Sequence, residues 1–259
     1  MREFFAKRKL NIICSVAAVA FMWIVWIIAY YAADNDYVIP SFTDTFVSLF
    51  QCFGESRFWA SFGWTVLRTA EAFVISFVLA LPCAVGAAFS KPFRHFMSPI
   101  IAVLRTLPAL AVVLLLLLWT GVRAAPVIVT VLLLFPVEYA QICAAIDGVD
   151  GQLLQMAEVY RVPRKDRLFK IYLPLASPGV LSQLGANFSL GLKVTISAEV
   201  LANTYTSLGG MMQSARAFLE MPRLAALTLI AVVTGLVVDI ALSQLKRVNS
   251  KWLKGDGND

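Results

Sequence analysis

The chain has 259 residues, of which 59% are hydrophobic and only 15% are charged, and its mean hydropathy is +0.77. A soluble domain is about half apolar and about a quarter charged, so this composition excludes an ordinary soluble protein. The net charge of +6 would suit a nucleic-acid partner. However, the basic residues lie beside apolar segments, which favours a role in membrane orientation, and we expect no nucleic-acid partner.

The apolar residues form six blocks, each about as long as a bilayer is thick, which takes about 20 residues per helix. An open strand would leave backbone groups unpaired in lipid, and the alternating pattern of a membrane barrel is absent, so we expect helices. The sequence therefore predicts an all-α membrane protein with six transmembrane helices between short tails at 1–10 and 246–259. The predicted spans are residues 11–33, 62–90, 97–120, 125–146, 176–202 and 224–245.

Shorter segments connect these blocks. A basic head also begins a signal peptide, but the first apolar block is longer than a signal peptide's core, which favours an uncleaved span. Residues 34–61 should hold an amphipathic interfacial helix that ends near Phe53. Residues 203–223 are expected to be a loop broken at Gly209-Gly210, and residues 147–175 are the one sizeable insertion.

The basic residues predict the orientation of the chain. If the N-terminus lies inside, fifteen lysines and arginines fall in cytoplasmic segments and four fall outside. This asymmetry follows the positive-inside rule and requires an even number of spans. We therefore expect a multi-pass protein of the bacterial inner membrane with both termini in the cytoplasm.

The insertion at 147–175 is charged but keeps several apolar side chains. Pro163 suits the first turn of a helix, so the sequence predicts a short basic helix over 163–170. A solvated basic loop against the lipid surface is the alternative interpretation. The functional interpretation is a helix that docks in a groove of a cytoplasmic partner. The residues that we expect at this contact are Arg161, Pro163, Arg164, Lys165, Arg167, Leu168 and Phe169.

This insertion resembles the EAA loop of binding-protein-dependent ABC importer permeases. The family's Ile-x-Leu-Pro ending matches residues 171–174, and Ala157 matches one alanine of its Glu-Ala-Ala element. Arg161 stands where the family has glycine, and Gln155 stands where it has glutamate. The departure at Arg161 affects the turn before the coupling helix, where Pro163 is an alternative turn residue.

Other segments extend the resemblance across the six spans in the correct order. They are similar to the sulfonate, taurine, nitrate and thiamine-precursor permeases, and they include residues 38–41, 105–111, 192–193, 198–201 and 207–210. The resemblance implies a type I importer bundle in which residues 163–170 form the coupling helix. The substrate could be a sulfonate, taurine, nitrate or a pyrimidine precursor of thiamine.

The resemblance also implies partners. The chain contains no GxxxxGK[ST] phosphate loop, so ATP and Mg would bind a separate cytoplasmic ATPase dimer. An extracytoplasmic binding protein or lipoprotein would deliver the substrate. A second permease copy, most simply an identical one, would enclose the pathway within the membrane lipid. We expect no cofactor on this chain itself.

Charged residues within the spans are costly and need a partner or a water-filled path. Arg68 and Glu71 are three residues apart and can pair along one helix face. Snorkelling near a span end is the expectation for Arg68, Glu138 and Asp239. The fifth block is rich in polar residues, which suits a helix that lines a cavity. The predicted pathway residues are Arg105, Asn187, Lys193, Thr195 and Glu199.

Two other classes of protein compete with this interpretation. A secondary transporter would need no ATPase, but it usually shows a longer chain or an internal repeat. An intramembrane enzyme is disfavoured because the chain has one histidine, His95, and no HExxH motif or nucleophile–base pair. We therefore expect no catalytic residue. The four cysteines are scattered without a CxxC motif, so no metal site is indicated.

Overall fold

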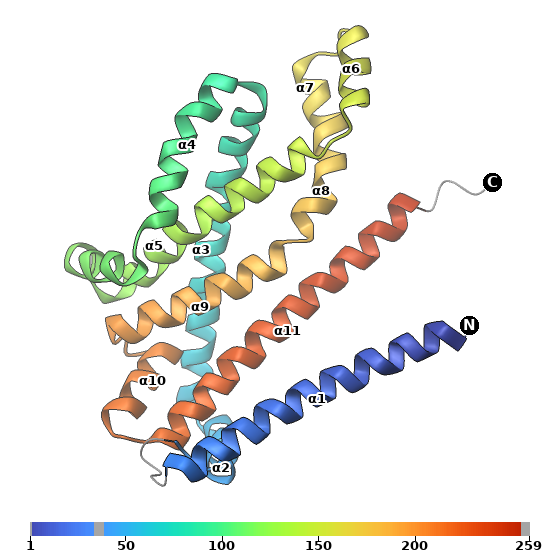
Figure 1. The fold of residues 1–259 in the computed structure, drawn as a ribbon. Helices are drawn as coiled ribbons and strands as arrows, with labels where there is room; N and C mark the ends of the chain where they lie inside the picture. The colour runs from blue at the N-terminus through green and yellow to red at the C-terminus, as the bar shows by residue number, and fades with distance from the viewer. Residues whose placement is uncertain (1, 34–38, 255–259) are drawn as a thin grey trace.

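The computed structural model describes residues 2–33 and 39–254, and every element in this part of the chain is a helix (Figure 1). The predicted all-α class is therefore confirmed. The helices are α1 (Arg2–Ala33), α2 (Phe42–Gly54), α3 (Ser56–Phe89), α4 (Lys91–Thr106), α5 (Ala109–Asp147), α6 (Gly151–Val159), α7 (Arg164–Arg167), η1 (Leu168–Tyr172), α8 (Leu173–Leu181), α9 (Leu184–Ala202), α10 (Leu208–Ala217) and α11 (Met221–Lys254).

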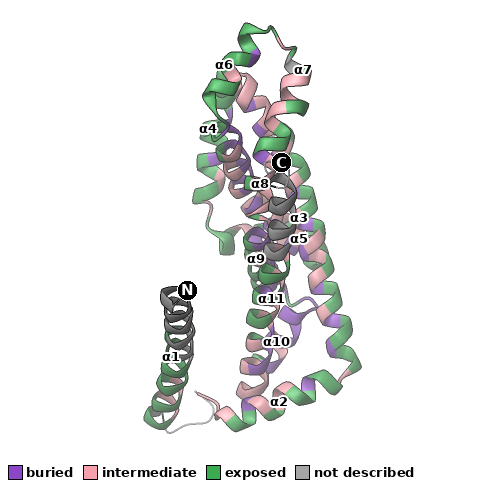
Figure 2. Ribbon diagram, turned by 90° about the vertical axis from the view of Figure 1, so that its right-hand side faces the viewer, coloured by how far each residue is buried: buried purple, intermediate pink, exposed green. Residues whose placement is uncertain are grey.

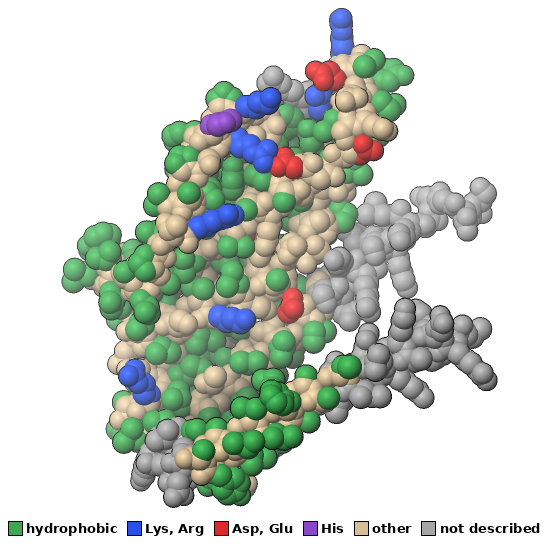
Figure 3. Space-filling model, in the orientation of Figure 1, with side chains coloured by type: hydrophobic (Ala, Val, Ile, Leu, Met, Phe, Trp, Pro, Cys, Tyr) green, Lys and Arg blue, Asp and Glu red, His purple; other side chains and the backbone are tan. Residues whose placement is uncertain are grey.

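Within the described residues, three helices are long and apolar enough to cross a bilayer. They are α3, α5 and the part of α11 from Met221 to Leu242. Their outward faces carry exposed large apolar side chains, and hydrophobic atoms spread over much of the surface in Figure 3. Such a surface suits lipid rather than water. The charged side chains in this view gather at the end formed by α4, α6 and α7.

The buried face of α3 is lined by small side chains. From Ser61 to Ala87 the buried positions recur every three or four residues, and all of them are serine, threonine or alanine. Small residues let helices approach closely where the surrounding lipid supplies no hydrophobic driving force. This face accordingly packs against α5 and α9, and buried residues follow the interior of the bundle in Figure 2.

The predicted span over 97–120 is not one helix. α4 ends at Thr106, and Leu107 leaves the helical region with φ −62° and ψ 125°. A residue before proline is pushed out of the α conformation, and Pro108 supplies that restriction. A second break falls inside α5 at Gly121, whose φ of 77° favours glycine. The block over 97–120 is therefore divided between α4 and the part of α5 that precedes Gly121.

The predicted short helix over 163–170 is not a separate element either. α7, η1 and α8 continue without a break to Leu181, so the segment leads directly into the fifth apolar block. One π-type turn, in which the Leu173 amide donates to the Leu168 carbonyl, joins α7 to α8. The fifth block itself is divided at Ser182-Gln183 between α8 and α9.

The N-terminal elements stand partly apart from the bundle. α1 is helical from Arg2, so residues 2–10 of the predicted tail are part of the helix. In Figure 2 the helix lies to one side of the other elements. It contacts the start of α2, where the Trp23 and Phe42 rings are 4.3 Å apart. The amphipathic helix predicted within 34–61 is present as α2, and Ser41 caps it by accepting from the Asp44 amide at 3.1 Å.

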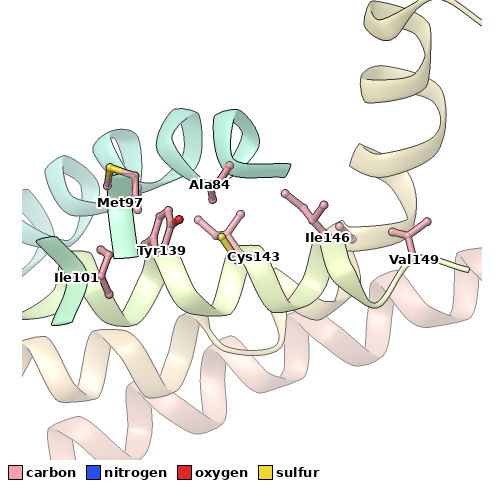
Figure 4. Close-up of a cluster of buried hydrophobic side chains, with 11 residues drawn as sticks. Ala84, Met97, Ile101, Tyr139, Cys143, Ile146 and Val149 are labelled. Atoms are coloured by element: carbon pink, nitrogen blue, oxygen red, sulfur yellow. The ribbon is translucent and has the colours of Figure 1, made fainter. Parts of the chain in front are cut away.

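A buried apolar cluster holds α3, α4 and α5 together near the charged end of the molecule. Figure 4 shows Ala84, Met97 and Tyr139 of this cluster facing one another. Beside it, the Arg94 guanidinium donates two hydrogen bonds to the Asp147 carboxylate, at 2.5 and 3.1 Å. These hydrogen bonds raise the pKa of Arg94. The cluster fixes the ends of α4 and α5 from which the α6–α8 segment projects.

Candidate functional site

The end of the molecule formed by α6 and α7 presents an exposed apolar surface. We define this docking surface by its exposed side chains, which are Leu153, Met156, Val159, Tyr160 and Phe169. Val159 is 79% exposed, Tyr160 76% and Phe169 65%. Exposed charged residues, among them Glu158, Arg161 and Lys165, lie close to these side chains in the sequence, so lipid is a poor partner for this end. An apolar patch with a polar rim is typical of a protein interaction site.

The chain positions this surface with two well-formed helix ends. Asp150 begins α6 by accepting from the Gln152 amide at 2.8 Å. At the other end Arg161 adopts a left-handed conformation with φ 52°. The Val162 amide donates to the Ala157 carbonyl at 2.9 Å, and the Arg161 amide donates to the Glu158 carbonyl at 3.0 Å. This is a Schellman motif, whose left-handed position usually holds glycine.

The structure thus explains the residue at the family's glycine position. Arg161 itself makes the left-handed turn that the glycine would make, and it does so although L side chains rarely adopt this conformation. Pro163 has a different role. Its carbonyl accepts a hydrogen bond from the Arg167 amide at 2.9 Å, and this is the first hydrogen bond of α7. Pro163 therefore does not replace the glycine turn.

The other predicted contact residues fall into two groups. Lys165 and Phe169 are exposed, while Arg167 and Leu168 are half-buried. Lys170 pairs with Asp166 at 3.2 Å along the same helical turn. The side chain of Arg164 lies outside the described residues. Met156, Val159 and Tyr160 were not among the predicted contact residues, although their spacing of three and four residues, which begins at Leu153, indicates one helix face.

A second feature is a buried ion pair between α3 and α9. Glu199 is fully buried, and its carboxylate lies 2.8 Å from the Arg68 guanidinium, which is 12% exposed. Thr65 donates to the same carboxylate at 2.8 Å, and the Gly209 amide donates to it at 3.3 Å. Arg68 also donates to the Thr206 carbonyl at 3.1 Å. We call these groups the Glu199 centre, and they join α3, α9 and α10.

The turn between α9 and α10 brings the Gly209 amide to this centre. Asn203 ends α9 in the left-handed region with φ 48°, and Ser207 caps α10 by accepting from the Gly210 amide at 2.8 Å. A Cβ atom on Gly209 would lie 2.4 Å from the Glu199 Cβ, and one on Gly210 would lie 1.9 Å from the Thr204 carbonyl oxygen. The two glycines were predicted to break a loop. They instead allow the first turn of α10 to pack against α9.

Several charged residues lie differently from their predictions. Arg68 pairs with Glu199 rather than with Glu71, so it is held inside the bundle and does not snorkel. Glu138 also lies inside, 1% exposed, where it accepts a short hydrogen bond from Ser76. Asp239 is exposed on α11.

The five predicted pathway residues are not gathered on one surface. Asn187 exchanges two hydrogen bonds with Gln141, at 2.6 and 3.0 Å, and buried Thr195 bonds Thr130 at 2.9 Å. Arg105 donates to the Pro136 carbonyl at 3.3 Å. With Glu199 in its ion pair, these four side chains link helices to one another.

Among the five predicted pathway residues, Arg105 and Lys193 are exposed, and Lys193 borders a cavity. The cavity is largely apolar, has a volume of about 640 Å³ and lies between α9 and α11. Asp239 lies on the wall of the same cavity, so a basic and an acidic group share it. A smaller cavity of about 160 Å³ between α5 and α9 also borders Lys193.

Long apolar helices and buried polar contacts between them define a helical membrane protein, and one charged end of it presents exposed apolar side chains. The model of the family described as "Binding-protein-dependent transport system inner membrane component" matches residues 72–251. The chain belongs to this family, which comprises the permeases of ABC importers.

Similar proteins agree on the family and differ in substrate. The chain is 32% identical over 192 residues to the aliphatic sulfonates transport permease protein SsuC of Bacillus subtilis strain 168, covering 73% of this chain and 68% of SsuC. It is 24% identical over 203 residues to the taurine transport system permease protein TauC of Escherichia coli K12, covering 78% and 74%. A glycine betaine permease, OpuAB of Bacillus subtilis, is 23% identical over 56% of this chain and 51% of its own length.

Solved structures support the fold. The chain is similar to a crystal structure of an amino acid ABC transporter with histidines, with a TM-score of 0.63 and 22% identity. The similarity covers 74% of this chain and 93% of that chain. The relatives are transport permeases rather than enzymes, so the expectation of a permease is confirmed.

Proposed function

We propose that this chain is the membrane-spanning subunit of an ATP-driven importer, and that a separate ATPase docks on the α6–α8 end. The observation that carries the proposal is the docking surface, where Val159, Tyr160 and Phe169 are exposed among charged groups. Buried apolar and aromatic anchors supply most of an interface's energy, while charges at its rim steer and orient the partner. Lys165 belongs to such a rim.

The experiment is co-purification of a cognate ABC ATPase with variants of the full-length chain. Tyr160→Ala combined with Phe169→Ala should reduce the retained ATPase at least tenfold, because it removes two anchors. Lys165→Ala is the matched control at the same surface and should change retention less than threefold. Full retention by the double variant would contradict the assignment of the docking surface.

We further propose that six spans with both termini in the cytoplasm place the docking surface inside the cell. The basic asymmetry of the sequence supports this orientation. A binding protein or lipoprotein would then deliver the solute to the opposite end, which holds α10. The solute could be a sulfonate, taurine, nitrate or a pyrimidine thiamine precursor. Binding of the delivery protein to a panel of these compounds would decide among them.

Two copies of this chain would enclose the pathway. Support comes from α1, which stands apart from its own bundle and presents exposed Phe21, Met22 and Ile24. Lys193 and the cavity between α9 and α11 are the features of the described chain that suit a pathway wall. Native mass spectrometry of the purified complex should give two identical permease chains per ATPase dimer. A complex with one copy of this chain would contradict the homodimer.

A further inference from the structure

A third cavity lies beside the Glu199 centre, because Arg68 and Thr206 also line it. The elements that form its walls lie toward the end of the bundle that holds α10, away from α6 and α7 (Figure 1). Its volume is about 580 Å³. The walls come from α3, the kink at Gly121 and the turn between α9 and α10. The aromatic, charged and polar residues that line the cavity are Trp64, Arg68, Glu71, Arg123, Tyr205 and Thr206.

Two opposite charges face this cavity without pairing. Within the described residues, neither Arg123 nor Glu71 forms an ion pair or a side-chain hydrogen bond with another residue. Arg68 is different, because Glu199 and the Thr206 carbonyl already accept from it. The cavity therefore offers one unpaired cation and one unpaired anion that do not neutralise each other. A ligand that carries both charges would satisfy both groups.

The aromatic walls restrict the kind of cation that can bind. The Arg57 guanidinium lies 4.8 Å from the centre of the Tyr205 ring, and the Arg68 guanidinium lies 5.8 Å from that of Trp64. A quaternary ammonium group is recognised by free aromatic faces, and here guanidinium groups already lie over both rings. Glu71 instead offers carboxylate oxygens, which need N–H donors on the ligand.

We propose that this cavity binds a small zwitterion with an N–H-bearing ammonium group and a sulfonate or carboxylate group. Glu71 accepts from the ammonium group and Arg123 donates to the acid group, in charge-assisted hydrogen bonds. The proposal rests on the proposed transport function and refines it. It distinguishes an amino-acid-like solute from a simple alkanesulfonate, which lacks the ammonium group, and from a betaine, which lacks the N–H donors.

The test measures binding of taurine, ethanesulfonate and glycine betaine to the purified full-length chain in lipid nanodiscs. Each charge-assisted contact should contribute about tenfold in affinity. Taurine should therefore bind about tenfold more tightly than either of the other two probes. Glu71→Gln should remove the preference for taurine over ethanesulfonate, and Arg123→Gln should weaken the binding of both about tenfold.

Arg216→Gln on α10 is the matched control, because Arg216 is exposed and does not line the cavity. It should leave all three affinities unchanged. The proposal is overturned if Glu71→Gln keeps the preference for taurine, if wild type shows none, or if Arg216→Gln weakens binding as much as Arg123→Gln.

Co-purification of the ATPase separates this inference from the proposed function. Glu71 and Arg123 lie far from the docking surface, so the Glu71→Gln and Arg123→Gln variants should retain the ATPase fully. If the wild-type chain retains the ATPase but shows no preference for taurine, only the proposed zwitterion site is overturned. Loss of the ATPase from the wild-type chain overturns the proposed importer.

Discussion

The buried ion pair of Glu199 and Arg68 contributes to stability only while both charges are present. We predict that Glu199→Gln lowers the free energy of unfolding by about 3 kcal/mol, because it leaves the guanidinium of Arg68 inside the bundle without a counter-charge. Thermal unfolding of the purified protein in detergent micelles measures the loss. Lys193→Gln is the control, since Lys193 is exposed and forms no ion pair in the described chain.

The replacement of both partners checks this explanation. Arg68→Met combined with Glu199→Met removes both charges together, so it should cost less than Glu199→Gln alone. A double variant that is less stable than the single one would mean that the hydrogen bonds from Thr65 and Gly209, rather than the charge pair, determine stability here.

Arg161 gives a second prediction at this scale. Its left-handed φ of 52° is strained for an L residue but natural for glycine. Arg161→Gly should therefore leave stability unchanged or raise it by up to about 1 kcal/mol, since glycine's greater freedom in the unfolded chain offsets part of the gain. Arg161→Val should lower the stability, because a β-branched residue is sterically disfavoured in the left-handed region of positive φ. Unfolding of both variants would show the order, and a glycine variant less stable than wild type would contradict it.

Single residues also show what the sequence can and cannot predict. The left-handed turn could be located because the family pattern places glycine at position 161. The partner of Arg68 could not be predicted, because helix spacing points to Glu71 three residues away, whereas Glu199 is 131 residues distant. Local periodicity contains no information about which faces of two remote helices meet. For the same reason the sequence did not predict the contacts that Asn187, Thr195 and Glu199 make with other helices, and their place on a pathway stays a prediction.

Helix α10 supplies the prediction at the scale of elements. Its first turn contacts α9 so closely that Gly209→Ala would place a methyl group 2.4 Å from the Glu199 Cβ. Such overpacking should cost about 1–3 kcal/mol and loosen the Glu199 centre. Gly63→Ala on α3 is the matched control, because its new Cβ would meet nothing within 4 Å and alanine favours a helix. Equal stability of the two variants would show that α10 can move away without cost.

The positions of the helices could be predicted where an apolar block alone determines them. The apolar block over 224–245 lies within α11, and the block over 62–90 lies within α3 up to Phe89, although Pro82 stands inside that helix. The block over 97–120 is not one helix, because Leu107-Pro108 interrupts it between α4 and α5 while hydropathy stays high. The helix predicted over 163–170 begins at Arg164, but it does not end at residue 170. Nothing between Arg167 and Leu173 ends a helix, so the segment continues into α8.

At the scale of the whole molecule, the two ends differ in chemistry. One end carries the docking surface, the Arg94–Asp147 pair and most of the charged groups seen in Figure 3. The other carries α2, α10 and the cavity with Glu71 and Arg123. This difference between the two ends suits an importer, in which the ATPase docks at one end and the solute is delivered at the other. Which end faces the cytoplasm depends on the number and direction of the membrane crossings.

That direction can be measured with two cysteine substitutions at exposed positions on opposite ends. Tyr160→Cys lies on the docking surface and Tyr205→Cys lies beside the turn that precedes α10, where the tyrosines are 76% and 78% exposed. The four native cysteines are first replaced by alanine, since Cys14 is exposed. In intact cells an impermeant maleimide should label position 205 and leave position 160 unlabelled until the membrane is opened. Labelling of both positions from the same side would contradict the proposed topology, and labelling of position 160 alone would reverse it and place the docking surface outside the reach of any ATPase.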